Sequence, residues 1–173
     1  MEIVENLKQW KADFRDGWLA HYERTGESDA DLYVRPRNLQ APAGKGIDLS
    51  QSRLLLITSS GAYLKHLQEP FDAEHQVGDY SIRTFPFSTP PNALAYAHTH
   101  YDHAAVDADP EVLVPLGHLS RMVDEGRIGE MAPTVISFGG YLRDVGRVVD
   151  EVIPPMLEIA RKEQVNGALL VPA

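Results

Sequence analysis

Apolar side chains near the N-terminus recur at every third or fourth position, which is the spacing of one face of a helix. This spacing is carried by Val4, Leu7, Trp10, Phe14 and Trp18. It predicts an amphipathic helix over about residues 3–24, with both tryptophans packed on the rest of the protein. Residues 35–52 mix proline, glycine and polar residues without a period, and they are predicted to form a linker.

Short apolar runs bounded by turn residues follow from Arg53 onward and predict buried strands. The predicted strands are Leu54–Thr58, Ser81–Phe85, Ala93–Ala97, Thr134–Phe138 and Ala168–Val171. All of them except Ser81–Phe85 are expected to run parallel in one sheet. Helical spacing over residues 113–123 and 145–159 predicts helices between strands, and Pro154-Pro155 should kink or divide the second helix.

Strands that alternate with helices predict an α/β fold, in which a mostly parallel sheet carries helices on both faces. Here this fold would be preceded by the N-terminal helical arm. We expect one compact domain overall, with a helix-and-linker arm over residues 1–52 and an α/β domain over residues 53–173.

The net charge and the absence of cysteine exclude some classes of function. The 173 residues contain 16 Lys and Arg against 25 Asp and Glu, a net charge of −9. This charge repels phosphates, so neither nucleic acid nor a membrane is an expected partner. No signal peptide or membrane-spanning apolar run is visible, which predicts a cytoplasmic protein. The chain contains no cysteine, which excludes disulfides and thiolate chemistry from its own residues.

Several predicted strands end in polar or glycine-rich segments. Ligands of parallel sheets bind outside the carboxyl ends of the strands, so these segments should converge on a pocket for a small-molecule substrate. Ser59-Ser60-Gly61 could hold an anion or form a tight turn, and Gly139-Gly140 could let a ligand approach or simply turn the chain. The predicted substrate-binding residues are Ser59, Ser60, Gly61, Tyr101, Gly139 and Gly140.

A cluster of histidines follows the predicted strand Ala93–Ala97. Three of the seven histidines lie within the six residues His98-Thr99-His100-Tyr101-Asp102-His103. Imidazoles and a carboxylate are ligands that a divalent ion such as zinc or iron favours, so His98, His100, Asp102 and His103 are candidate metal ligands. Alternatively, these residues shape a polar pocket without metal. The candidate catalytic residues are His98, Asp102 and His103.

The same six residues spell HxHxDH, the signature of the metallo-β-lactamase fold, which would imply a metal-dependent hydrolase. That fold needs further histidine ligands downstream, and the last histidine after His103 is His118, inside a predicted helix. The predicted order of strands and helices also differs from that fold. Nearby, Asp107 and Asp109 could supply a base, although an N-terminal helix cap is the simpler role.

A resemblance to another family extends from Arg53 to the end of the chain. It is carried, in order, by LLLITSSGAYL, GDYSIRTFP, AHTHYDHAAVDADPEVLVPLGHLSRMVDEGRIGEM, VISFGGY and EIARKEQVNGALLVPA. Their order and spacing resemble the selenoprotein B-like family of glycine/sarcosine/betaine/D-proline reductases. The positions that match the family's third block are His98, Tyr101-Asp102, Asp107 or Asp109, Val114-Pro115-Leu116 and Glu125–Gly129.

The resemblance implies an oxidoreductase that cleaves a small amino-acid-like substrate reductively with a thiol or selenol. It also implies reductase subunits as partners, or a homo-oligomer. The family's Cys or selenocysteine motif would follow Leu169–Pro172, and this sequence ends at Ala173. The expectation is therefore either a truncated enzyme or a member without thiol chemistry that binds a ligand or a partner subunit.

Overall fold

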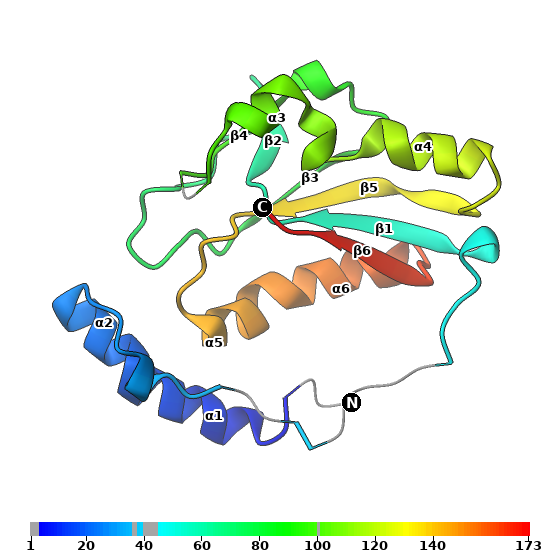
Figure 1. Cartoon of the computed structure of the whole chain (residues 1–173). Coiled ribbons are helices and arrows are strands. Elements are labelled where there is room, and N and C mark those ends of the chain that lie inside the picture. The colour runs from blue at the N-terminus through cyan, green and yellow to red at the C-terminus, as the bar shows by residue number, and fades with distance from the viewer. Residues whose placement is uncertain (1–3, 36–37, 40–44, 100) are drawn as a thin grey trace.

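The computed structural model describes residues 4–35, 38–39, 45–99 and 101–173. Its centre is a four-stranded sheet in the order β3-β5-β1-β6 (Figure 1). The strands are β1 (Arg53–Thr58), β3 (Ile82–Pro86), β5 (Glu130–Phe138) and β6 (Gly167–Val171). β1 runs parallel to both β5 and β6, and β3 is antiparallel to β5. The predicted α/β class with a mostly parallel sheet is thus confirmed.

One predicted strand of the parallel sheet is wrong. The run Ala93–Ala97 forms β4 (Leu94–Tyr96), which pairs antiparallel with β2 (Ala62–Leu64) in a separate two-stranded sheet. A strand inside a parallel sheet is apolar and buried on both faces. In β4 only Leu94 is buried, and the preceding Pro90-Pro91 leads into a 3-10 turn, η4 (Pro91–Ala93). This run is short and has small side chains, so it forms a strand outside the main sheet.

Helices cover both faces of the main sheet, as the alternation of side chains along β1 requires. Leu54 and Leu56 contribute to a core beneath α4 (Leu116–Asp124), whereas Leu55 and Ile57 contribute to a second core with residues of α6 (Ile153–Lys162). Figure 1 shows α4 above the sheet and α6 below it. Leu55 and Leu56 are both 0% exposed, so adjacent residues of one strand anchor the two opposite layers.

The long C-terminal helical segment is interrupted, as Pro154-Pro155 predicts. α5 (Val145–Arg147) continues into a π-helical turn, η6 (Val148–Val152), and then into α6. The prolines lack the amide hydrogens that would bond to carbonyls one turn earlier, so the regular ladder fails at this point. The remaining short helices are η2 (Ala30–Leu32), η3 (Leu49–Gln51), α3 (Ala104–Ala108) and η5 (Pro110–Val112).

The N-terminal arm is helical through α1 (Leu7–Phe14), the π turn η1 (Arg15–Leu19) and α2 (Ala20–Thr25). Aromatic rings follow one another along it and form a ladder. The ring centroids are 6.1 Å apart for Trp10 and Phe14, 5.5 Å for Phe14 and Trp18, and 5.3 Å for Trp18 and Tyr22. The rings from Phe14 to Tyr22 pack against Val77 and Val145, which is the packing predicted for Trp18. The Trp10 indole instead donates a hydrogen bond to the Val34 carbonyl within the N-terminal segment.

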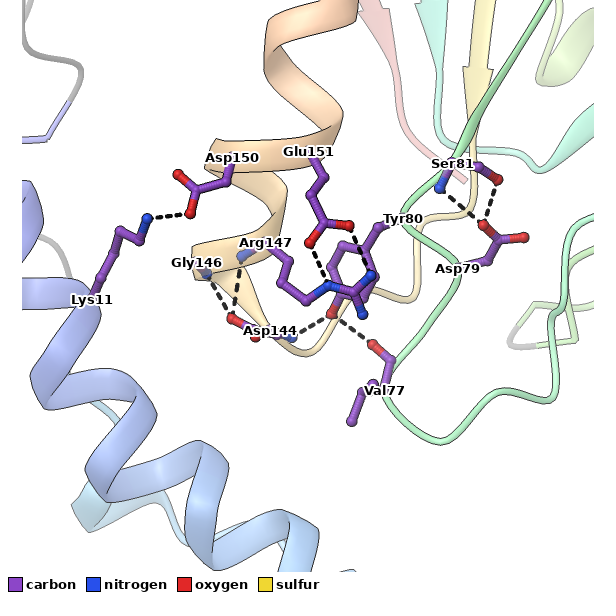
Figure 2. Close-up of polar contacts among 10 residues, drawn as sticks. All are labelled: Lys11, Val77, Asp79, Tyr80, Ser81, Asp144, Gly146, Arg147, Asp150 and Glu151. Carbon is purple, nitrogen blue, oxygen red and sulfur yellow. Dashed lines mark hydrogen bonds and ion pairs between the residues drawn. The ribbon is translucent and has the colours of Figure 1, made fainter.

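An ion pair between Lys11 of α1 and Asp150 of η6 adds a second contact between the arm and the C-terminal helical segment (Figure 2). The division into an arm over residues 1–52 and a domain over residues 53–173 stays a prediction. Within the residues that the structure describes, no helix is both long and apolar enough to cross a bilayer.

Candidate functional site

The loops that follow β1, β4 and β5 lie together, as the rule for strand ends predicts. Ser60 and Gly139 form an isolated antiparallel bridge, and the Gly61 amide donates a hydrogen bond to the Phe138 carbonyl at 3.0 Å. The Ala97 amide donates to the Gly61 carbonyl, also at 3.0 Å. These backbone contacts bring the start of the histidine cluster to the end of the main sheet, although β4 is not a strand of that sheet.

His98 occupies a space that two glycines leave open. His98 as a whole is only 8% exposed to solvent. A side-chain carbon at Gly140 would lie 3.1 Å from His98 Nε2, and one at Gly61 would lie 3.3 Å from His98 Cβ. Gly61 also has a φ of +67°, a conformation that favours glycine. The imidazole is therefore set against the backbone of two different strand-end loops.

The other described members of the cluster mainly brace this loop. His103 Nε2 lies 2.5 Å from the His98 carbonyl oxygen, so this nitrogen acts as the donor. The Tyr101 ring contacts both histidines, with centroids at 4.7 Å from His98 and 4.6 Å from His103, and its hydroxyl donates to the Ser60 carbonyl at 3.2 Å. Burial raises the pKa of Tyr101 to about 12, with a further contribution from Asp107, so its hydroxyl is protonated at neutral pH.

Carboxylates near the cluster act at the starts of short helices. Asp102 Oδ1 accepts a hydrogen bond from the Ala104 amide at 2.9 Å, at the start of α3. Asp109 Oδ1 accepts one from the Glu111 amide at 3.0 Å, at the start of η5, which is the capping role expected for it. Neither contact directs a carboxylate toward His98.

The metal-site prediction depends on a residue outside the described ones, His100. Among the residues that are described, no three His, Asp or Glu side chains are grouped so that they could hold a metal ion. His98, Asp102 and His103 are separated by their different contacts, His103 with the loop backbone and Asp102 with α3. The zinc or iron site therefore stays a prediction of the sequence.

A narrow pocket opens beside His98, with a cavity volume of about 10 Å³, which is the room that one water molecule needs. Ligand pockets usually measure roughly 300–1,000 Å³, so a small substrate would enter only as residues of the pocket wall move apart. It is lined by Phe71, Asp72, Ala73, Gly78, Asp79, Ala97, His98, Gly139 and Tyr141. Of the predicted site residues, His98 and Gly139 line it, while Gly61 and Gly140 shape it from behind the imidazole.

Three of the predicted site residues lie near these strand ends but do not line the pocket. Ser59 Oγ accepts a hydrogen bond from the Ala173 amide at 3.0 Å. The Ser60 side chain is fully buried, and His103 lines a separate hollow with Tyr96 and Asp107. Among the described members of the histidine cluster, His98 is the one that lines the pocket. The role of these residues in a site stays a prediction.

Sequence reasoning missed the segment of residues 71–79, which forms one wall of the pocket. Burial raises the pKa of the Asp79 carboxyl, but hydrogen bonds from the Ser81 side chain and from the Asp72 and Ser81 amides, with the charge of Arg83, outweigh burial and leave it below its usual range. The wall therefore carries a negative charge at neutral pH. Gly78-Asp79-Tyr80 belongs to the stretch GDYSIRTFP, whose glycine was the available indication of a special turn.

Comparison with known proteins agrees with the resemblance found in the sequence. A family model described as glycine/sarcosine/betaine reductase selenoprotein B matches residues 27–167. The D-proline reductase subunit gamma of Acetoanaerobium sticklandii is 26% identical over 144 residues, which are 83% of this chain and 57% of that protein. The chain thus spans a little more than half of this relative's length. No solved structure matches it. Because the family model covers most of the sequence, the chain belongs to the glycine/sarcosine/betaine reductase selenoprotein B family.

Proposed function

We propose that this protein is an oxidoreductase component that binds a small amino-acid-like substrate in the pocket beside His98. The observation that carries the proposal is the burial of His98 against Gly61 and Gly140, on the wall of a narrow pocket at the strand ends. Membership of a reductase family supports the choice of substrate class. The relative from A. sticklandii is named as a subunit, which supports assembly with further reductase subunits.

The pocket residues suit the two ends of such a substrate. An amino acid or betaine carries a cationic nitrogen and a carboxylate. The acidic side chains of Asp72 and Asp79 and the aromatic side chains of Phe71 and Tyr141 favour the cationic end. The His98 imidazole can donate a hydrogen bond to the carboxylate. A thiol or selenol is not among these residues, so reductive cleavage would draw on another polypeptide segment or subunit.

Substitution of His98 with asparagine is expected to weaken substrate binding at least tenfold, equivalent to about 1.4 kcal/mol. Asparagine keeps a polar group but shortens the side chain, so the donor no longer reaches the pocket. Isothermal titration calorimetry with glycine, sarcosine, betaine and D-proline measures the dissociation constants, and the tightest ligand indicates the substrate class.

The matched control is His118→Asn, because His118 is exposed on α4 and is not part of the pocket lining. Its affinity should equal that of the unmodified protein. If none of the four compounds binds the unmodified protein, the proposed function is wrong. If His98→Asn binds as tightly as the unmodified protein, the substrate does not contact His98.

A further inference from the structure

The aromatic ladder of the N-terminal arm ends beside the pocket wall. Tyr22, its last ring, is stacked on Trp18 with an angle of 1° between the ring planes. The Tyr22 hydroxyl lies 3.2 Å from the hydroxyl of Tyr141, and the two residues are 119 positions apart in the sequence. Tyr141 lines the pocket, whereas the arm does not reach it directly, since the lining residues all come from positions 71–141. Tyr22 thus connects the arm to a pocket residue.

Arg143 strengthens this connection. Its guanidinium lies 4.1 Å from the centroid of the Tyr22 ring and 4.6 Å from that of Tyr141, so one cation contacts both aromatic faces. Arg143 Nε also donates a hydrogen bond to the Tyr141 hydroxyl. The hydrogen bond with Tyr141, together with burial, raises the pKa of Tyr22, so the Tyr22 hydroxyl is protonated at neutral pH. The orientation of Tyr141 is therefore fixed by groups from both segments.

The same arm also contacts the second wall of the pocket. Val77 packs against the aromatic ladder, and its carbonyl accepts hydrogen bonds from the Arg143 amide at 3.1 Å and from the Tyr80 hydroxyl at 2.7 Å. The Tyr80 hydroxyl accepts one from the Asp144 amide at 2.6 Å. Figure 2 shows Tyr80 between Val77 and Asp144. Residues 77–80 and 141–144 are therefore held together as one unit, against which the arm packs.

We infer that Tyr22 is a positioning residue, which sets the orientation of Tyr141 in the pocket wall and thereby raises the affinity for the substrate. The inference rests on the proposed function, because it assigns a role to the arm in the binding of the same ligand. It adds a residue of the N-terminal arm, which is far in sequence from every strand-end motif.

The first test follows Tyr141 itself, without a ligand. Protein labelled with ¹³C on the tyrosine rings gives NMR signals that single Tyr→Phe variants assign. Tyr22→Phe removes one hydroxyl and keeps the ring, so it should fold normally and should shift the Tyr141 ring signals. The matched control is Tyr33→Phe, since Tyr33 packs edge-on against Phe14 and Trp18 in the same aromatic group and does not line the pocket. It should leave the Tyr141 signals in place.

The second test measures affinity for the four compounds named above. Tyr22→Phe should weaken binding about three- to tenfold, the effect of losing one hydrogen bond, while Tyr33→Phe binds normally. The double variant Tyr22→Phe/Tyr141→Phe should bind no more weakly than Tyr141→Phe alone, because both substitutions remove the same hydroxyl contact. A purely structural role of Tyr22 would not produce this non-additivity.

The outcomes separate the two proposals. Shifted Tyr141 signals together with weaker, non-additive binding support the inference. Unshifted signals, or unchanged affinity of Tyr22→Phe, overturn it. If the unmodified protein binds none of the compounds, the proposed function fails, and the Tyr141 signals alone then decide whether the arm positions this residue.

Discussion

Gly78→Ala is expected to lower the free energy of unfolding by about 3 kcal/mol. Gly78 has a φ of +100°, which side chains rarely adopt. An added Cβ would also collide with the carbonyl oxygen of Tyr141 and lie 3.2 Å from Leu142 Cα. Both contacts are with backbone, so the segment at 141–142 must move as a whole. Urea denaturation followed by circular dichroism measures the loss.

Gly26→Ala is the matched control for this substitution. Gly26 has a φ of +72° at the end of α2, and a Cβ there would meet no atom within 4 Å. This variant carries the backbone penalty alone and should lose about 1 kcal/mol. Equal losses in the two variants would show that Gly78 and Tyr141 are not in close contact. Because Tyr141 lines the pocket, Gly78→Ala should in addition weaken ligand binding.

Leu56→Ala is expected to lower the free energy of unfolding by about 2–5 kcal/mol, because it removes a fully buried side chain and leaves a cavity. Leu56 is 0% exposed in β1, which lies between β5 and β6, and it belongs to the core beneath α4. Thermal and urea denaturation measure the effect, and the slope of the urea transition shows whether the unfolded state has changed.

The same substitution at an exposed leucine tests how β6 is covered. Leu170 is 68% exposed on β6, the edge strand next to β1. Leu170→Ala should change stability by no more than about 0.5 kcal/mol. A loss comparable to that of Leu56→Ala would mean that the edge of β6 is buried in solution, as it would be in an assembly with another subunit.

The strands that the sequence predicted correctly are those in which the local pattern and the tertiary role agree. β1 and β5 are apolar runs inside the sheet, which parallel strands need. β6 was also predicted as a strand, but its predicted burial is wrong, because its position at the edge of the sheet leaves Leu169 and Leu170 exposed. Ala93–Ala97 has a similar run, but its alanines add little buried area, and Pro90-Pro91 precedes it. Its position beside β2 is decided by contacts between distant residues, such as the bond from Ala97 to Gly61, which no local pattern reports.

The candidate site was predicted in part for the same reason. His98 could be identified because it directly follows a strand, where ligands of α/β proteins bind. The directions of Asp102 and His103 depend on the turn that Tyr101 and Ser60 fix, so adjacency in sequence did not predict a shared role. Residues 71–79 and Tyr141 lie in irregular segments, which carry no periodicity. The contact from Tyr22 joins residues 119 positions apart, and composition alone gives no indication of it.

The π turn at Arg15–Leu19 sets the rotational phase between the aromatic rings on its two sides. In a regular α-helix each residue advances by about 100°, so rings spaced four residues apart drift by about 40° per step. The wider turn reduces this drift and keeps Trp10, Phe14, Trp18 and Tyr22 in one stack. Loss of one residue from this turn would let it close as a regular α-helical turn with little rotation of α1, because four α-helical residues advance by about 400°, close to the advance of five residues in the wider turn. Loss of one residue within α1 itself, between Trp10 and Phe14, would instead rotate Trp10 by about 100° away from the aromatic stack. The π turn is therefore the place in the arm where the chain can shorten by one residue while the packed face of α1 and the hydroxyl of Tyr22 keep their common orientation.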